Sequence, residues 1–246
     1  MNTELENKGY YVPEQGYAVM AATKTFMAQV FLWMTFAMAV TAITAYMFAS
    51  SESLIMSLRN PITGGLSGLG WIVTLAPIGF VLLMSFGFQK LSPGMMALLF
   101  IAFSILMGMS LSFILLVYTA ASVYKTFAVT AAMFGVMAVL GYTTKTDLTR
   151  FGSLMMMGLF GIIIAMVINM FLRSGTMDYI ISIIGVLVFT GLTAYDVQKL
   201  KKMSQAGMEE TGDGNVRKLS IMGALTLYLD FINLFLFLLR FLGNRR

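Results

Sequence analysis

"LTLYLDFINLFLFLLRFLG", residues 225–243, decides the fold class, because it is long and apolar enough to cross a bilayer yet carries an acidic residue, Asp230. A membrane-spanning helix needs about 20 mostly apolar residues. An ionised aspartate in the middle of the membrane costs about 2.5–3.5 kcal/mol on insertion scales, so it must face protein or water. The stretch therefore predicts a membrane helix whose acidic face is turned away from lipid.

The composition favours the same class of protein. Of 246 residues, 59% are hydrophobic and 11% are charged, whereas about a quarter of the residues in soluble domains are charged. The net charge of +5 does not indicate nucleic-acid binding, because basic residues gather in the cytoplasmic loops of membrane proteins. Cysteine and histidine are both absent, which excludes disulfides, thiolate nucleophiles and metal sites built on either residue. Any metal would be a hard cation held by oxygen.

The sequence predicts an all-α integral membrane protein with seven transmembrane helices. The apolar runs cover residues 26–49, 69–88, 93–118, 123–142, 151–172, 179–197 and 219–242. We expect a polar cytoplasmic tail at 1–25, a membrane domain at 26–242, and a short basic tail at 243–246. The polar segment 199–220 is expected to form a mobile loop.

Two features bear on how these helices pack and how they lie in the membrane. Ser104, Gly108 and Ser112 recur every four residues, and such a stripe of small residues lets two helices approach closely. With a cytoplasmic N-terminus, ten basic residues fall on the cytoplasmic side and three in the opposite loops. This bias predicts a multi-pass protein of the cell's inner membrane with its N-terminus inside. Seven full spans would place "GNRR" (243–246) outside, so a re-entrant seventh segment stays open.

Polar residues on the last two helices share one side of each helix. At 100° per residue, Thr226, Asp230 and Asn233 lie on one narrow stripe of the seventh helix, and Thr193 and Asp196 on one stripe of the sixth. The two helices are expected to be antiparallel neighbours. Their aspartates could then meet, directly or through water, in a pocket that is open to the cytoplasm.

Two interpretations of the aspartates remain open. Two carboxylates in contact share a proton and titrate as a unit, and when deprotonated they offer oxygen ligands to Ca²⁺. Asp196 and Asp230 are therefore candidates for a proton sensor and for cation ligands, with Thr193, Thr226 and Asn233 as a supporting polar face. Alternatively, Asp196 lies at the interface beside Lys199 and Asp230 bonds to Asn233 or a neighbouring helix, both in structural roles.

Several motifs resemble those of the transmembrane Bax inhibitor motif family, also called the Bax inhibitor-1 family, and its bacterial members in particular. They are "FTGLTAYDVQKLKK" (189–202), "ALTLYLDFINLFLFLLRFLG" (224–243), "TTKTDLTRFG" (143–152), "MGLFGIIIAMVIN" (157–169) and "IIGVLVFTGL" (183–192). The resemblance covers nearly everything after the N-terminal tail and is strongest from Thr143 to Leu242.

The resemblance implies a bundle in which the seventh helix is central and the other six surround it. It also implies a pH-sensitive Ca²⁺ leak across the membrane, with the family's aspartate pair falling on Asp196 and Asp230 and with Ca²⁺ as the permeant or bound ion rather than a resident cofactor. Family members of this type often carry an acidic residue and an arginine latch in helix two. The corresponding "TLAPIGFVLLMSFGFQKLS" (74–92) contains neither, and Gly87 stands about where the arginine is expected.

The aspartates also fit two other classes of function. Aspartates on the sixth and seventh helices are also found in presenilin-like intramembrane proteases, but the Gly-x-Gly-Asp motif of those enzymes is replaced here by Leu-Tyr-Leu-Asp at 227–230. We therefore expect no enzymatic activity. The main alternative is a regulatory protein that binds a membrane protease or another membrane partner through its N-terminal tail or through residues 199–218.

Overall fold

The computed structural model describes residues 13–205 and 212–245, and it is helical nearly throughout. The helices are α1 (Pro13–Ser50), α2 (Glu52–Leu58), α3 (Gly68–Phe86), α4 (Pro93–Val117), α5 (Ala120–Thr143), α6 (Thr149–Leu172), α7 (Gly175–Gln205) and α8 (Asp213–Leu242). All except α2 are long and apolar enough to cross a membrane. The predicted all-α protein with seven membrane-spanning helices is confirmed.

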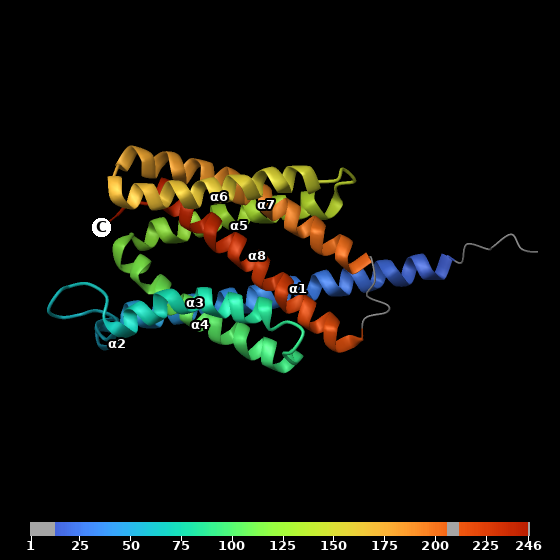
Figure 1. The fold of residues 1–246 in the computed structure, drawn as a ribbon, viewed down its shortest axis with the longest axis horizontal. Coiled ribbons are helices and arrows are strands. Elements are labelled where there is room, and N and C mark those ends of the chain that lie inside the picture. The colour runs from blue at the N-terminus through green and yellow to red at the C-terminus, as the bar shows by residue number, and fades with distance from the viewer. Residues whose placement is uncertain (1–12, 206–211, 246) are drawn as a thin grey trace, which may run out of the picture.

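Helix α8 is the inner helix of the bundle. Figure 1 shows it running diagonally between a group formed by α1, α3 and α4 and a group formed by α5, α6 and α7. It packs against α1, α4, α5 and α7, whereas α3 packs mainly on α4 and α6 mainly on α7. In their most apolar windows, 72% of the residues of α8 are buried, against 11% in α6. An acidic residue in the middle of α8 is therefore shielded from lipid by other helices.

The predicted stripe of small residues lies where α4 meets α1. Ser104 and Ser112 are fully buried, and a Cβ atom added to Gly108 would lie 2.6 Å from the carbonyl oxygen of Thr41 in α1. No side chain fits in that space, so the backbones of the two helices can approach this closely only at a glycine.

Helix α8 crosses the whole bundle, so the re-entrant alternative is wrong. Thirty residues at 1.5 Å per residue span about 45 Å, more than the hydrocarbon core of a bilayer. Just after its end, Asn244 is bonded to the start of α5 and the residue before it: its carbonyl accepts from the N–H of Thr119 (3.1 Å) and its N–H donates to Ser122 Oγ (3.0 Å). The C-terminal end of the chain thus lies opposite the end of the bundle where α1 begins (Figure 1).

The helices extend beyond the apolar runs into polar sequence. The segment 199–220 was predicted to be a loop, but α7 continues to Gln205 and α8 begins at Asp213; residues 206–211 lie outside the described part. Residues 13–25, assigned to the polar tail, are the first turns of α1. Residues 1–12 of that tail lie outside the described part of the chain. Hydropathy marks the part of a helix that lies in the membrane and not its polar ends, which explains these differences.

Lysines in the polar ends of α7 and α8 bind the ends of other helices. Lys201 Nζ donates to the carbonyl of Tyr142 in α5 at 2.7 Å, and Lys218 Nζ donates to the carbonyl of Phe88, just after α3, at 3.0 Å. Each ammonium also lies about 5 Å from the ring centroid of the same residue, 5.0 Å for Tyr142 and 4.9 Å for Phe88. Cations satisfy the last carbonyls of helices well, so these polar turns are held by tertiary contacts.

Candidate functional site

Asp230 lies in the middle of α8 with its side chain turned into the bundle. The residue is 5% exposed, and its Oδ2 atom has no hydrogen-bond partner among the residues that the structure describes. Buried polar atoms are almost always hydrogen-bonded, and leaving one unpaired costs about 1–3 kcal/mol, more for a charged group. This oxygen therefore requires a proton, a cation or water to satisfy it.

The carboxyl group of Asp196 on α7 is a direct neighbour of the Asp230 carboxyl, within reach of a hydrogen bond. Asp196 is only half-buried, so it lies closer to water than Asp230 does. Lys199, one turn further along α7, is exposed and adds a positive charge on the Asp196 side. The structure thus brings together the two aspartates that the sequence singled out; a role as sensor or cation ligand stays a prediction.

The three other polar residues of the predicted face bond within their own helices. Thr193 donates to the carbonyl of Phe189 (2.8 Å), Thr226 to that of Met222 (3.1 Å), and Asn233 Nδ2 to that of Leu229 (2.8 Å). The described residues contain no hydrogen bond from any of them to Asp196 or Asp230. Asn233 is thus not the structural partner that the alternative interpretation gave to Asp230.

Two buried hydroxyls and a backbone carbonyl join three helices on another side of α8. Thr41 Oγ1 in α1 donates to the carbonyl of Ser104 in α4 (2.9 Å) and therefore accepts from the hydroxyl of Tyr228 in α8 (2.7 Å). Tyr228 is fully buried, and the rings of Phe100 and Phe103 meet it edge-on. Sequence reasoning missed this group. The available signal was a tyrosine within a buried apolar run, since a buried tyrosine hydroxyl usually finds a partner.

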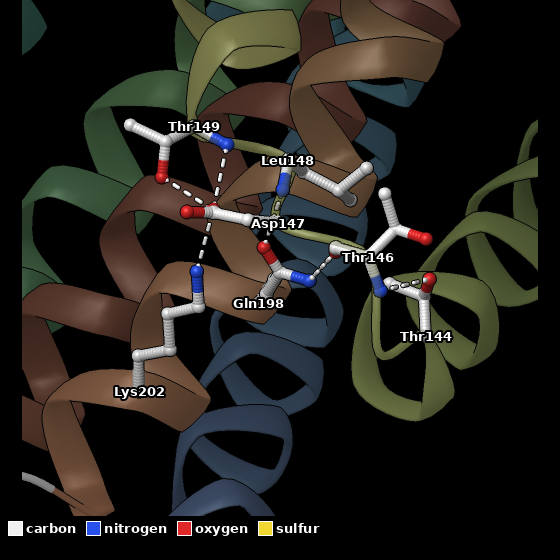
Figure 2. A network of polar contacts seen from close by, with 7 residues as sticks. All are labelled: Thr144, Thr146, Asp147, Leu148, Thr149, Gln198 and Lys202. Atoms are coloured by element: carbon white, nitrogen blue, oxygen red, sulfur yellow. Dashed lines mark hydrogen bonds and ion pairs between the residues drawn. The ribbon is translucent and has the colours of Figure 1, made fainter.

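A polar network at the start of α6 involves a third aspartate (Figure 2). Asp147 Oδ1 accepts hydrogen bonds from Lys202 Nζ (2.6 Å) and from the hydroxyl and N–H of Thr149 (2.6 and 3.0 Å). The hydrogen bond from the Lys202 ammonium, helped by those from Thr149, holds the pKa of Asp147 well below its usual range. This exposed carboxylate is ionised at physiological pH and serves as an anchor for α7.

Gln198 of α7, two residues after Asp196, completes this network. Its side chain accepts from the N–H of Leu148 and donates to the carbonyl of Thr146, both at 2.8 Å (Figure 2). The connection between α5 and α6 is thereby fixed to α7 through side-chain bonds to its backbone. At the opposite end of the bundle, Arg240 of α8 forms an ion pair with Asp178 of α7 at 3.2 Å. The segments that carry Asp196 and Asp230 thus lie between two anchored ends.

The described residues contain no group of three or more acidic side chains that could hold a metal ion. Asp196 and Asp230 together offer four carboxylate oxygens, whereas Ca²⁺ takes six to eight oxygen ligands. Any cation held here would have to keep several waters or take backbone oxygens.

Comparison with known proteins agrees with the resemblance found in the sequence. The family described as "Inhibitor of apoptosis-promoting Bax1" matches residues 23–246. The chain is 48% identical over 226 residues to the inner membrane protein YbhL of Escherichia coli K12. The aligned region covers 92% of this chain and 94% of that protein. It is 43% identical to an uncharacterized protein of Borreliella burgdorferi (90% and 92% covered) and 42% identical to one of Rickettsia prowazekii (91% of each). With its seven apolar helices, the chain is a multi-pass inner membrane protein that belongs to the Bax inhibitor-1 family.

Proposed function

We propose that the protein mediates a pH-sensitive leak of Ca²⁺ across the membrane, with Asp196 and Asp230 as its proton and cation sensor. The observation that carries this proposal is the unpaired, buried oxygen of Asp230 beside a second carboxyl group. An ionisable residue within a membrane helix is expensive and is a functional candidate by default. A purely structural aspartate would be expected to have its oxygens hydrogen-bonded by the surrounding helices.

The chemistry of the pair links protons to cations. When one carboxyl group is protonated, its O–H can donate to the other, and one proton then satisfies both groups. When that proton leaves, two adjacent negative charges face each other in an apolar surrounding, and a divalent cation is the simplest compensation. Protons and Ca²⁺ therefore compete for the same place, which makes occupancy depend on pH.

The surroundings of the pair differ from the usual family pattern in one respect. Helix α3 provides neither an acidic residue nor an arginine to latch the pair. The polar link between α3 and α8 is instead the bond from Lys218 to the carbonyl of Phe88, 12 residues before Asp230 along α8. The chain therefore lacks the arginine that would compensate the negative charge of the pair from α3.

Flux measurements in liposomes test the proposal directly. The purified protein is reconstituted with a Ca²⁺ indicator trapped inside, and Ca²⁺ entry is followed at a series of pH values for the wild type, Asp230→Asn and Asp147→Asn. We expect wild-type flux to vary with pH and Asp230→Asn to lose that dependence, because the amide cannot titrate. Asp147→Asn is the matched control, since it removes a carboxylate that lies outside the bundle core and stays ionised.

Flux that is absent, or that responds to pH equally in wild type and Asp230→Asn, would reject the leak mechanism. That outcome would turn attention to the regulatory alternative, in which the protein acts by binding a membrane protease or another membrane partner. Deletion of residues 1–24 would then be the next variant, scored by whether its phenotype depends on that protease.

A further inference from the structure

An apolar groove runs along α8 between α1 and α5. A cavity of about 700 Å³ lies between the later part of α1, the end of α4 and the start of α5, with Phe231, Ile232 and Phe235 of α8 along its wall. A second cavity of about 450 Å³ continues it toward the other end of the bundle. Both are lined by Met38, Ala42, Phe127 and Phe231. We call the two together the lateral groove.

The lateral groove is continuous with the surface that faces lipid. Its walls come from α1 and α5, which belong to opposite groups in Figure 1 and are both long and apolar enough to span the membrane. Tyr46 of α1 and Tyr124 of α5 line it and are 66% and 72% exposed. No charged side chain lines either cavity. The molecules that meet this opening in the bilayer are therefore lipids.

The groove is long enough to hold a lipid chain. Its lining on α1 runs from Phe31 to Ser50, which is about 28 Å at 1.5 Å per residue and close to the thickness of the whole hydrocarbon core, so one acyl chain, which crosses a single leaflet, fills about half of it. Tyr46 and Tyr124 lie toward one end of it, and exposed tyrosines favour the level of the lipid headgroups. A chain entering there would run down the groove toward Gly135, where a Cβ atom would meet nothing within 4 Å.

Its volume and polarity indicate which molecule fills it. A helix about 10 Å wide and 28 Å long occupies roughly 2,000 Å³, more than both cavities offer, so a helix could only lie over the opening. Cavities of about 300–1,000 Å³ hold single small molecules. Thr41 lines the groove in its buried part, but its hydroxyl is already bonded to Ser104 and Tyr228 and is not free for a polar ligand. We propose that the lateral groove binds one acyl chain of a membrane phospholipid.

Photo-crosslinking in liposomes tests this site and does not depend on the Ca²⁺ proposal. The protein is reconstituted with a phosphatidylethanolamine that carries a diazirine in one acyl chain, irradiated and analysed by peptide mass spectrometry. We expect labelling of the α8 segment around Phe231, which is only 3% exposed and which a chain reaches only by entering the groove. The lipid-facing side of α6, represented by Phe160 at 61% exposure, gives the background of ordinary lipid contact.

Two neighbouring alanines of α5 provide a matched pair of variants. Ala131 lines the groove and Ala132 lines neither cavity, although both are exposed. Ala131→Phe should lower labelling around Phe231 several-fold by filling the groove, whereas Ala132→Phe should leave it unchanged. Ala42→Phe, on the opposite wall, should act like Ala131→Phe. Thermal unfolding of each variant verifies that it is folded.

Three results would overturn the proposal. The first is no labelling around Phe231 above the level of other buried segments. The second is labelling that Ala131→Phe and Ala132→Phe change equally. The third is a cross-linked dimer or complex whose groove is closed to the lipid probe, which would show that a second copy or another protein covers it.

Discussion

At the scale of single residues, the two aspartates differ in how far they are from water. Asp230 is almost fully buried and Asp196 is half-buried. Water can partly compensate the loss of a partner at Asp196, but not at Asp230. Asp196→Asn should therefore retain more of the wild-type variation of Ca²⁺ flux with pH than Asp230→Asn does, measured as the ratio of flux at the two ends of the pH series in the same liposomes. An equal or larger loss of that variation in Asp196→Asn would place the deciding proton on α7 instead.

A second residue-scale prediction concerns the hydroxyls that join α1, α4 and α8. Thr41→Val removes the acceptor of the buried Tyr228 hydroxyl and should lower the free energy of unfolding by about 1–3 kcal/mol. Tyr228→Phe removes that hydroxyl together with its need for a partner and should cost less, about 1 kcal/mol. The double variant should be less destabilised than the sum of the two. Thermal unfolding in detergent measures this order, with Tyr195→Phe as a control for the loss of a tyrosine hydroxyl.

At the same scale, the sequence located the aspartates but not their surroundings. Asp196 and Asp230 stand out because charges within apolar runs are rare, and helical spacing alone places each on an inner face. The pairing of Tyr228 with Thr41, 187 positions apart, depends on which helices are neighbours. Helical periodicity carries no information about that, so these contacts required the structure.

At the scale of helices, the contact of α1 with α4 depends on one glycine. Gly108→Ala would place a methyl group 2.6 Å from the Thr41 carbonyl oxygen, and overpacking of this kind costs about 1–3 kcal/mol. Gly161→Ala in α6, where a Cβ atom meets nothing within 4 Å, should instead be neutral or stabilising, because alanine favours helices. The midpoint of thermal unfolding should fall in Gly108→Ala and should stay the same or rise in Gly161→Ala. Similar destabilisation by both would mean that α1 and α4 are not in such close contact.

The anchoring of α6 to α7 by Asp147 has a defined pH dependence. A folded-state pKa below the unfolded value means that the carboxylate contributes stability above its unfolded pKa, about 3.9, and that this contribution is lost as pH falls through the folded pKa. Asp147→Asn should therefore lower the thermal midpoint by the same amount at pH 5 and at pH 8. A difference between wild type and variant that shrinks between pH 8 and pH 5 would contradict the strong bond to Lys202.

The extent of the helices shows where hydropathy stops being informative. The predicted segment 93–118 coincides almost completely with α4 (Pro93–Val117), because the helix there ends where the apolar run ends. The predicted segment 179–197 is shorter than α7 (Gly175–Gln205), whose last turns are polar and are held by Lys201 and Lys202 through tertiary bonds. Apolar length measures the thickness of the membrane and not the length of the helix.

At the scale of the whole molecule, the odd number of spanning helices fixes how the two ends of the chain relate. Since α8 crosses completely, the C-terminal end lies on the side opposite the start of α1. Of the sixteen lysines and arginines, ten fall on the side where α1 begins. The other side has the remaining six, including the three C-terminal arginines. The bias of basic residues then predicts that α1 begins, and that α7 and α8 are connected, in the cytoplasm. The proton concentration that reaches Asp196, nearer that end, would be the cytoplasmic one.

Reporter fusions test this orientation. Alkaline phosphatase, which is active only outside the cytoplasm, should be active when fused after Arg246 and inactive when fused at residue 208 between α7 and α8. Green fluorescent protein should give the reverse pattern, because it becomes fluorescent when it folds in the cytoplasm. Activity of the phosphatase at residue 208 would invert the molecule. The Asp196 side of the pair would then sample the pH outside the cytoplasm, and a leak controlled by it would respond to external instead of internal acidification.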